Sequence, residues 1–206
     1  MKKMPTMQRF QLVLLFALLP LLSLAQQVGY TPLRPDIVEA ERKAASAKMA
    51  AVSSALTDAY DLKYNRFQWA VDPAVKYISG NITSYFEPVG AAMDTLYFDL
   101  SDSLTVDSVK YHGNAVTFAH LSGELLRIVF PATIPQGALD SVSVWYQGAP
   151  VGTGFGSFIQ DQHVGTPIIW TLSEPYGGKD WMPCKNGITD KIDSIDMYVT
   201  APAGNR

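Results

Sequence analysis

The residues best suited to chemistry lie near the C-terminus, in a polar and aromatic loop from Ser173 to Gly187. Segments with strand character flank this loop, and loops on a β scaffold that combine acids, aromatic residues and glycines commonly carry sites. Its acid Glu174 directly precedes Pro175, which restricts the backbone of Glu174. A carboxylate held there could receive a cationic group such as an amine. From the residues alone, a surface acid or an ion-pair partner of Lys179 is an equally good interpretation.

Other candidate nucleophiles and ligands have weak support in the sequence. None of the three histidines, His112, His120 and His163, is followed by Glu or has a second His at helical spacing, so the zinc-peptidase helix pattern is missing. We interpret them as surface residues and predict no metal site and no catalytic residue in these 206 residues. Cys184 is the only cysteine, which excludes an internal disulfide. We interpret it as a buried packing thiol rather than a nucleophile.

The N-terminal residues are typical of a targeting signal. Basic residues precede an apolar run, Leu12 to Leu22, and the small residues Ser23 and Ala25 predict cleavage before Gln26. We therefore expect residues 1–25 to be a signal peptide and the protein to be exported, to a periplasm or out of the cell. The apolar run is short for a membrane span, so none is expected after cleavage. The mature net charge of about −6 disfavours nucleic acid as a partner.

Residues 26–58 form an expected leader and helical arm. Pro35 and Asp36 begin an alanine-rich segment with good helix propensity, which continues to about Leu56. Its narrow apolar stripe favours an arm or linker that docks weakly, and a dimerisation helix is the alternative.

From residue 59 to 206 the pattern is that of strands, so an all-β domain is predicted. Phe67, Trp69 and Val71 alternate with polar residues, and a change of parity near Asn65 indicates a bulge. After a first strand at 60–71, later strands are expected at 77–87, 96–100, 104–111, 115–119, 125–130, 140–146, 168–172 and 192–200, with Pro131 ending the strand 125–130. Short strands separated by turns predict an antiparallel β-sandwich or saddle-like sheet.

The loop also resembles a family signature. Glu174-Pro175, Gly178-Lys179, Pro183-Cys184 and Asn186 resemble the pattern E-P-x-x-A-R-x-x-x-P-C-x-D of the aminopeptidase N family, the gluzincin type of zinc metallo-aminopeptidase. The spacing is the same, with Lys in place of Arg, Gly in place of Ala and Asn in place of Asp. The order of upstream strands is similar too, so the resemblance covers about residues 60–202.

This resemblance implies the N-terminal domain of such an enzyme, incomplete at its C-terminal end. It implies that Glu174 binds the free α-amino group of a peptide substrate, with Pro175 and Tyr176 shaping the rim. The catalytic zinc helix of the family lies in the next domain and is not in this sequence. We therefore expect no cofactor in this chain and no peptidase activity from the chain alone. The zinc is expected in the missing catalytic domain, which would belong to the same polypeptide (in cis).

A stand-alone secreted β-sandwich binding module, such as an adhesin or a carbohydrate-binding domain, is the alternative. It requires an exposed aromatic platform, which Trp69, Trp145, Trp170 or Trp181 could provide. Alternation within the strands favours core positions for Trp69 and Trp145. Genomic sequence after Arg206 that continues to H-E-x-x-H would favour the peptidase.

Overall fold

The computed structural model describes residues 39, 42, 55–152, 157–173, 176–187 and 189–205. The predicted signal peptide, 1–25, lies outside these residues. Of the predicted helical arm before residue 55, only Glu39 and Arg42 are described, both with helical backbone. The arm therefore stays a prediction. The elements below lie in the compact unit Ala40–Arg206.

The described residues form an all-β fold, as predicted. Its elements in chain order are η1 (Ala55–Ala59), β1 (Tyr60–Asp72), β2 (Val75–Pro88), β3 (Met93–Asp99), β4 (Leu104–Tyr111), β5 (Asn114–Ala115), β6 (Thr117–Leu121), β7 (Leu125–Ile134), β8 (Asp140–Gly148), β9 (Ile159–His163), β10 (Thr166–Trp170), η2 (Gly178–Asp180) and β11 (Ser194–Thr200). The described elements include no helix long and apolar enough to cross a membrane.

The main sheet has the strand order β11-β1-β2-β8-β4-β5. Strand β1 follows the predicted alternation, since Phe67 and Trp69 are buried and Val71 packs against the core. The register between β1 and β2 shifts between Leu62 and Tyr64, close to the bulge that the sequence predicts. Side chains beyond the bulge therefore keep one face of β1 apolar.

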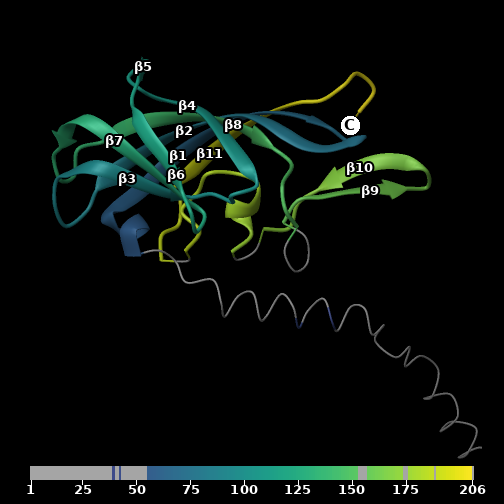
Figure 1. Cartoon of the computed structure of the whole chain (residues 1–206), viewed down its shortest axis with the longest axis horizontal. Coiled ribbons are helices and arrows are strands. Elements are labelled where there is room, and N and C mark those ends of the chain that lie inside the picture. The colour runs from purple at the N-terminus through teal and green to yellow at the C-terminus, as the bar shows by residue number, and fades with distance from the viewer. Residues whose placement is uncertain are drawn as a thin grey trace, which may run out of the picture. The chain divides into compact units, whose positions relative to one another are not determined.

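A second sheet, in the order β3-β7-β6, completes the sandwich core (Figure 1). Leu96, Leu126 and Ile128 of this sheet are fully buried, together with Ile82 and Phe86 from the main sheet. Rings of both sheets interlock, since Tyr60 lies edge-on to Phe86 and to Phe98 with centroids 5.9 and 6.1 Å apart. With no disulfide available, this apolar contact stabilises the fold.

Strand β7 does not end at Pro131, contrary to the prediction. It continues to Ile134, which pairs with Met93 across a register shift in β3. Pro131 is exposed at this irregularity, where a missing backbone N–H does not interrupt the ladder.

Two pairings were not predicted. Strands β9 and β10 form a separate two-stranded hairpin, drawn in Figure 1 away from the second sheet. Strand β11 pairs parallel with β1, so the predicted antiparallel sheet is mixed at this edge. The first and last strands of the domain are therefore neighbours.

The four tryptophans do not form an aromatic platform. Trp69 and Trp181 are buried, with ring centroids 4.9 Å apart. Trp145 is only half-buried, so its predicted core position is wrong: its neighbours Val144 and Tyr146 face the core, and Trp145 lies on the other side beneath Lys110. Trp170 is 40% exposed. No observation among these rings favours the binding module.

Candidate functional site

The predicted amine-binding residue, Glu174, and its neighbour Pro175 lie outside the described residues. The residues on either side of them are described. The carbonyl of Ser173 accepts a hydrogen bond from the amide of Gly177 at 2.7 Å, and the Ser173 hydroxyl accepts one from Nε1 of Trp181 at 2.8 Å. The first bond joins Ser173 to Gly177, and the second joins Ser173 to Trp181.

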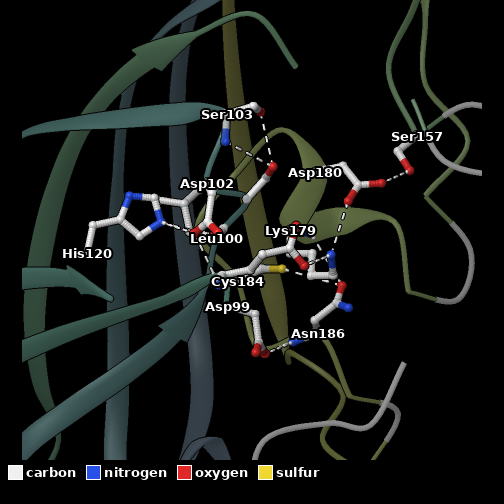
Figure 2. Close-up of polar contacts among 12 residues, drawn as sticks. Asp99, Leu100, Asp102, Ser103, His120, Ser157, Lys179, Asp180, Cys184 and Asn186 are labelled. Carbon is white, nitrogen blue, oxygen red and sulfur yellow. Dashed lines mark hydrogen bonds and ion pairs between the residues drawn. The ribbon is translucent and has the colours of Figure 1, made fainter. Parts of the chain in front are cut away.

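The rest of the motif loop is tied to the end of β3. Asp99, the last residue of that strand, forms an isolated antiparallel bridge with Cys184. The amide of Asn186 also donates to Oδ2 of Asp99 at 2.9 Å (Figure 2). The loop therefore gains three hydrogen bonds from one strand residue, all of them involving residues that are less than a tenth exposed.

Asn186 also holds the loop together internally. Its side-chain oxygen accepts the amide of Lys179 at 3.3 Å and lies 3.8 Å from the thiol of Cys184. The resemblance places an aspartate at this position. An amide oxygen makes the same contacts without adding a third buried acid beside Asp99 and Asp180.

Lys179 supplies a positive charge to the corner, by which we mean the cluster of Asp99, Lys179, Asp180, Cys184 and Asn186 where the motif loop meets the end of β3. Its ammonium group contacts the carboxylate of Glu124 and lies 3.3 Å from Oδ1 of Asp180, while its carbonyl accepts the amide of Ser101 at 2.8 Å. Burial acts to lower the pKa of Lys179, but the bond to Glu124 and the charge of Asp180 outweigh it and hold the pKa above its ordinary value. Lys179 therefore carries its charge at neutral pH.

Asp180 is fully buried, on the turn of η2. The hydroxyl of Ser157 donates to its Oδ2 at 2.5 Å, and Figure 2 shows Asp180 between Ser157 and Lys179. Gly177 makes this arrangement possible, because a Cβ at Gly177 would stand 2.3 Å from the Ser157 hydroxyl oxygen. The close approach explains why the loop has glycine here.

The electrostatics of the corner oppose chemistry by Cys184. Burial, with the charges of Asp99 and Asp180, raises the pKa of the Cys184 thiol well above its ordinary value. Burial also raises the pKa of Asp99, although the Asn186 amide and the charge of Lys179 act the other way. Cys184 is buried, as predicted, and a protonated, buried thiol is a poor nucleophile.

The histidines do not converge on a site. His112 is exposed in the turn after β4 and bonds Oδ1 of Asp140 at 2.6 Å. His120 is half-buried and its Nε2 donates to the carbonyl of Leu100 at 3.0 Å, so it is not the surface residue that was expected. His163 is exposed, as predicted, at the end of β9, a strand that the sequence did not predict.

The described residues do not fit a zinc site. They contain no group of three or more His, Cys, Asp or Glu side chains that could hold a metal ion. Zinc sites require three or four such ligands in tetrahedral arrangement. A zinc-dependent reaction would therefore need ligands from outside the described residues.

A large apolar groove lies beside the motif loop, with a volume of about 1020 Å³. Trp69 and Phe158 line it together with Ser173, Trp181 and Cys184 of the motif loop. Ser173, the residue directly before Glu174 in the sequence, therefore lines this groove.

No protein-family model and no curated protein matches the sequence. Solved structures do match the fold. An M1 zinc metallopeptidase from Deinococcus radiodurans aligns over 70% of this chain with a TM-score of 0.61 and 20% identity. Native leukotriene A4 (LTA4) hydrolase from Saccharomyces cerevisiae aligns over 77% with a TM-score of 0.58 and 15% identity. The predicted resemblance is thus confirmed at the level of the fold.

The matched region is only a part of each similar structure. The chain spans 33% of the Deinococcus chain and 27% of the yeast chain. One of the Deinococcus structures is an E323A mutant bound to a Tyr-Ser-Ala substrate. These descriptions belong to the longer enzymes.

The structure brings together the described motif residues Gly178, Lys179, Cys184 and Asn186. Their spacing alone suggested this loop, but their anchors were missed. Asp99 ends β3 and Glu124 lies in the turn before β7, and both carry no sequence signal beyond being acids that follow or precede apolar runs. Nothing in the sequence distinguishes Ser157 from other loop serines.

Proposed function

We propose that this chain is the N-terminal, substrate-side domain of an exported zinc-dependent aminopeptidase, which removes N-terminal residues from peptides. The observation that carries the proposal is the anchored corner on this fold. Residues at the spacing of the peptidase signature pack into one buried unit, and the fold around them is similar to that of M1 zinc metallopeptidases.

Within this proposal, Glu174 binds the α-amino group of the substrate. It directly follows Ser173, whose carbonyl and hydroxyl are both hydrogen-bonded and which lines the apolar groove. A carboxylate that meets an ammonium group in a partly desolvated cleft forms a strong charge-assisted hydrogen bond. Such a bond requires a free N-terminus and so favours exopeptidase action over cleavage within a chain.

The zinc and the general base belong, on this proposal, to a catalytic domain of the same polypeptide. The peptide substrate then lies between that domain and the Glu174 segment. Because the described residues offer no metal-binding group, the chain alone is proposed to be inactive. Metal analysis of the purified chain tests this directly, and stoichiometric zinc that resists dialysis would contradict it.

The decisive experiment is a substitution of Glu174 in the enzyme that contains both domains. Glu174→Ala removes a charge-assisted bond of about 1.5–3 kcal/mol, so KM for free-amine dipeptides should rise on the order of 10–100-fold. Asp94→Ala, at an exposed acid of β3, is the matched control and should leave KM unchanged. Unchanged kinetics in Glu174→Ala, or equal cleavage of N-acetylated peptides, would exclude the proposed role.

A further inference from the structure

The main sheet has an outer face, on the side away from the core, whose composition is unusual. Between the levels of Tyr85 and Tyr77 on β2, the strands β1, β2, β8 and β4 are described completely, and their outward residues include no aliphatic side chain larger than alanine. Most of these residues carry aromatic rings, amides or hydroxyls. We call this surface the ring-and-amide face, after Tyr64, Tyr77, Tyr85, Gln68, Asn81 and Gln147.

The rings of this face follow the direction of β2. Tyr64 and Tyr85 lie edge to face, with ring centroids 5.5 Å apart. Tyr77 lies further along β2, and Trp145 lies between the two levels because β8 pairs it with Asn81. Asn81 is midway between Tyr77 and Tyr85, so the rings stand at levels roughly 13 Å apart along the strand. This spacing suits an extended chain rather than one small molecule.

Amide side chains lie between the rings. Gln68 and Asn81 are opposite each other on β1 and β2, and neither side chain bonds to another described residue. Asparagine is depleted in strands, yet Asn81 lies in the interior of β2. The Tyr77 hydroxyl donates to Oε1 of Gln147 at 2.7 Å, and Nε2 of Gln147 donates to Asp107 at 2.9 Å. The face thus combines a fixed ring with unused amide donors and acceptors.

The charges between these two levels favour an uncharged occupant. Arg66 and Lys110 are balanced by Asp107 and by Asp196, which β11 places beside Arg66. A nucleic acid requires a surplus of cations, and an apolar protein surface requires an apolar centre to bury. A neutral polysaccharide requires neither. Its sugar rings present C–H groups that pack on aromatic faces, and its hydroxyls exchange hydrogen bonds with amides.

We propose that the ring-and-amide face binds a neutral polysaccharide as an extended chain along β2. The chain packs on Tyr85 and Tyr77 and exchanges hydrogen bonds with Gln68 and Asn81. The apolar groove uses the opposite face of the sheet, where Phe67 lines it, so this site goes beyond the proposed peptidase function and does not depend on it. It gives the domain a means of attachment and does not make it a stand-alone binding module.

One ring of the face is already covered. The ammonium group of Lys110 lies over Trp145, 4.9 Å from the ring centroid. Cation–π contacts at exposed sites are weak, so an incoming sugar ring displaces this ammonium group. Lys110→Ala should therefore bind the polysaccharide at least as tightly as the parent.

Titration calorimetry of the purified chain tests the site with three neutral polysaccharides, barley β-glucan, wheat arabinoxylan and konjac glucomannan, and with dextran sulfate as an anionic control. At least one neutral polymer should bind, and its Kd should be unchanged at about 0.5 M NaCl, since salt screens only charges. Glucose should not compete, because one sugar does not span two rings. Binding of none of the neutral polymers, or of dextran sulfate alone, would overturn the inference.

Three aromatic residues of nearly equal exposure provide a matched set. Tyr77, Tyr85 and Trp170 are 39%, 37% and 40% exposed, but Trp170 lies on β10, outside the face. Tyr77→Ala and Tyr85→Ala should each raise the Kd ~5-fold or more through the lost ring contact. Tyr85→Phe, which keeps the ring, and Trp170→Ala should bind like the parent. An equal loss in Trp170→Ala, or no loss in either alanine variant, would contradict the site.

A further variant keeps the test valid if an alanine variant of a tyrosine unfolds. Gln68→Ala, at an exposed position of β1, should raise the Kd ~3-fold or more with an unchanged Tm. Sedimentation of the chain examines the other occupant, a second copy. Self-association that Tyr85→Ala abolishes, without polysaccharide binding, would overturn the inference. Because none of these measurements uses peptidase activity, failure of this site and failure of the proposed function are separate outcomes.

Discussion

The amide of Asp99 donates to the carbonyl of Cys184 at 2.8 Å, and the amide of Cys184 donates back to the carbonyl of Asp99 at 3.0 Å. This pair joins the end of β3 to the motif loop. The side chain of Asp99 adds a bond to the amide of Asn186, 87 positions further along the chain. The orientation of the loop thus depends on a residue of the sandwich core.

Asp99→Asn should therefore be tolerated better than Asp99→Ala. Burial raises the pKa of Asp99, so its ionised form disfavours the folded state at neutral pH, and this penalty diminishes as the pH falls through the folded-state pKa. Asparagine keeps an acceptor for Asn186 and removes the charge, whereas alanine leaves a buried amide unpaired at a cost of about 1–3 kcal/mol. Urea unfolding at pH 7 measures the free energy of unfolding of both variants, and an equal loss of stability in the two would refute this account.

Lys179→Met should destabilise the fold by about 2–3 kcal/mol, because Asp180 would be left buried without its lysine. The value is below that of a fully enclosed pair because the Lys179 side chain is 20% exposed and Glu124 is 37% exposed. Lys179→Arg, which keeps the positive charge, should lose less than half as much stability. Lys110→Met, at an exposed lysine above Trp145, is the control, and a similar loss there would show that the buried acid is not the cause.

Gly177→Ala should cost more stability than Gly178→Ala. A Cβ at Gly177 would lie 2.3 Å from the Ser157 hydroxyl oxygen and 3.1 Å from Cα of Ser173, so the hydroxyl must leave Asp180. A Cβ at Gly178 would lie 3.0 Å from the thiol of Cys184, where a smaller shift suffices. Overpacking of this kind costs about 1–3 kcal/mol, which we expect for Gly177→Ala alone. Thermal unfolding measures the stability of both variants. A larger loss in Gly178→Ala than in Gly177→Ala would contradict the packing described.

Asp140 should contribute stability that is lost in acid. Burial acts to raise its pKa, but hydrogen bonds from Tyr111 at 2.6 Å, the Ser141 amide at 2.7 Å and His112 lower it overall. A lowered folded-state pKa gives stability that is present above the ordinary carboxyl pKa and disappears as the pH falls through the folded value. Asp140→Asn should be less stable than the parent at pH 7, and the difference should shrink below about pH 4.

The same pair offers a spectroscopic check. The bond to Asp140 and burial raise the pKa of Tyr111 to about 12. In Asp140→Asn the tyrosinate should appear at lower pH in an ultraviolet titration. A titration identical to that of the parent would show that Tyr111 does not depend on this carboxylate.

Local patterns were sufficient to predict the strands of the sandwich. Alternation placed Phe67 and Trp69 in the core, and the change of parity in β1 located its bulge. The same rule failed at Trp145, because either face of β8 carries an aromatic residue and only the sheet packing selects Tyr146 as the buried one. Strand β9 was missed because its sequence, IQDQH, lacks apolar alternation and its pairing with β10 alone makes it a strand.

The candidate site was also predictable only in part, because local patterns identify its loop but not the distant residues that orient it. Motif spacing identified the loop, since Gly178, Lys179, Cys184 and Asn186 lie within nine consecutive residues. The contacts that orient it join residues far apart in sequence, such as Glu124 with Lys179 and Asp99 with Asn186. A single sequence contains no signal for such pairs, because each acid is compatible with an ordinary surface position. The function of Glu174 follows from resemblance and stays a proposal.

The pairing of β1 with β11 has a consequence for synthesis. Tyr64 and Asp196, which meet across this pair, are 132 positions apart. At about 5–20 residues per second, the ribosome needs on the order of ten seconds to make the second strand after the first has emerged. During that interval β1 is available to wrong partners, so a chaperone that holds the nascent chain should raise the yield of native protein.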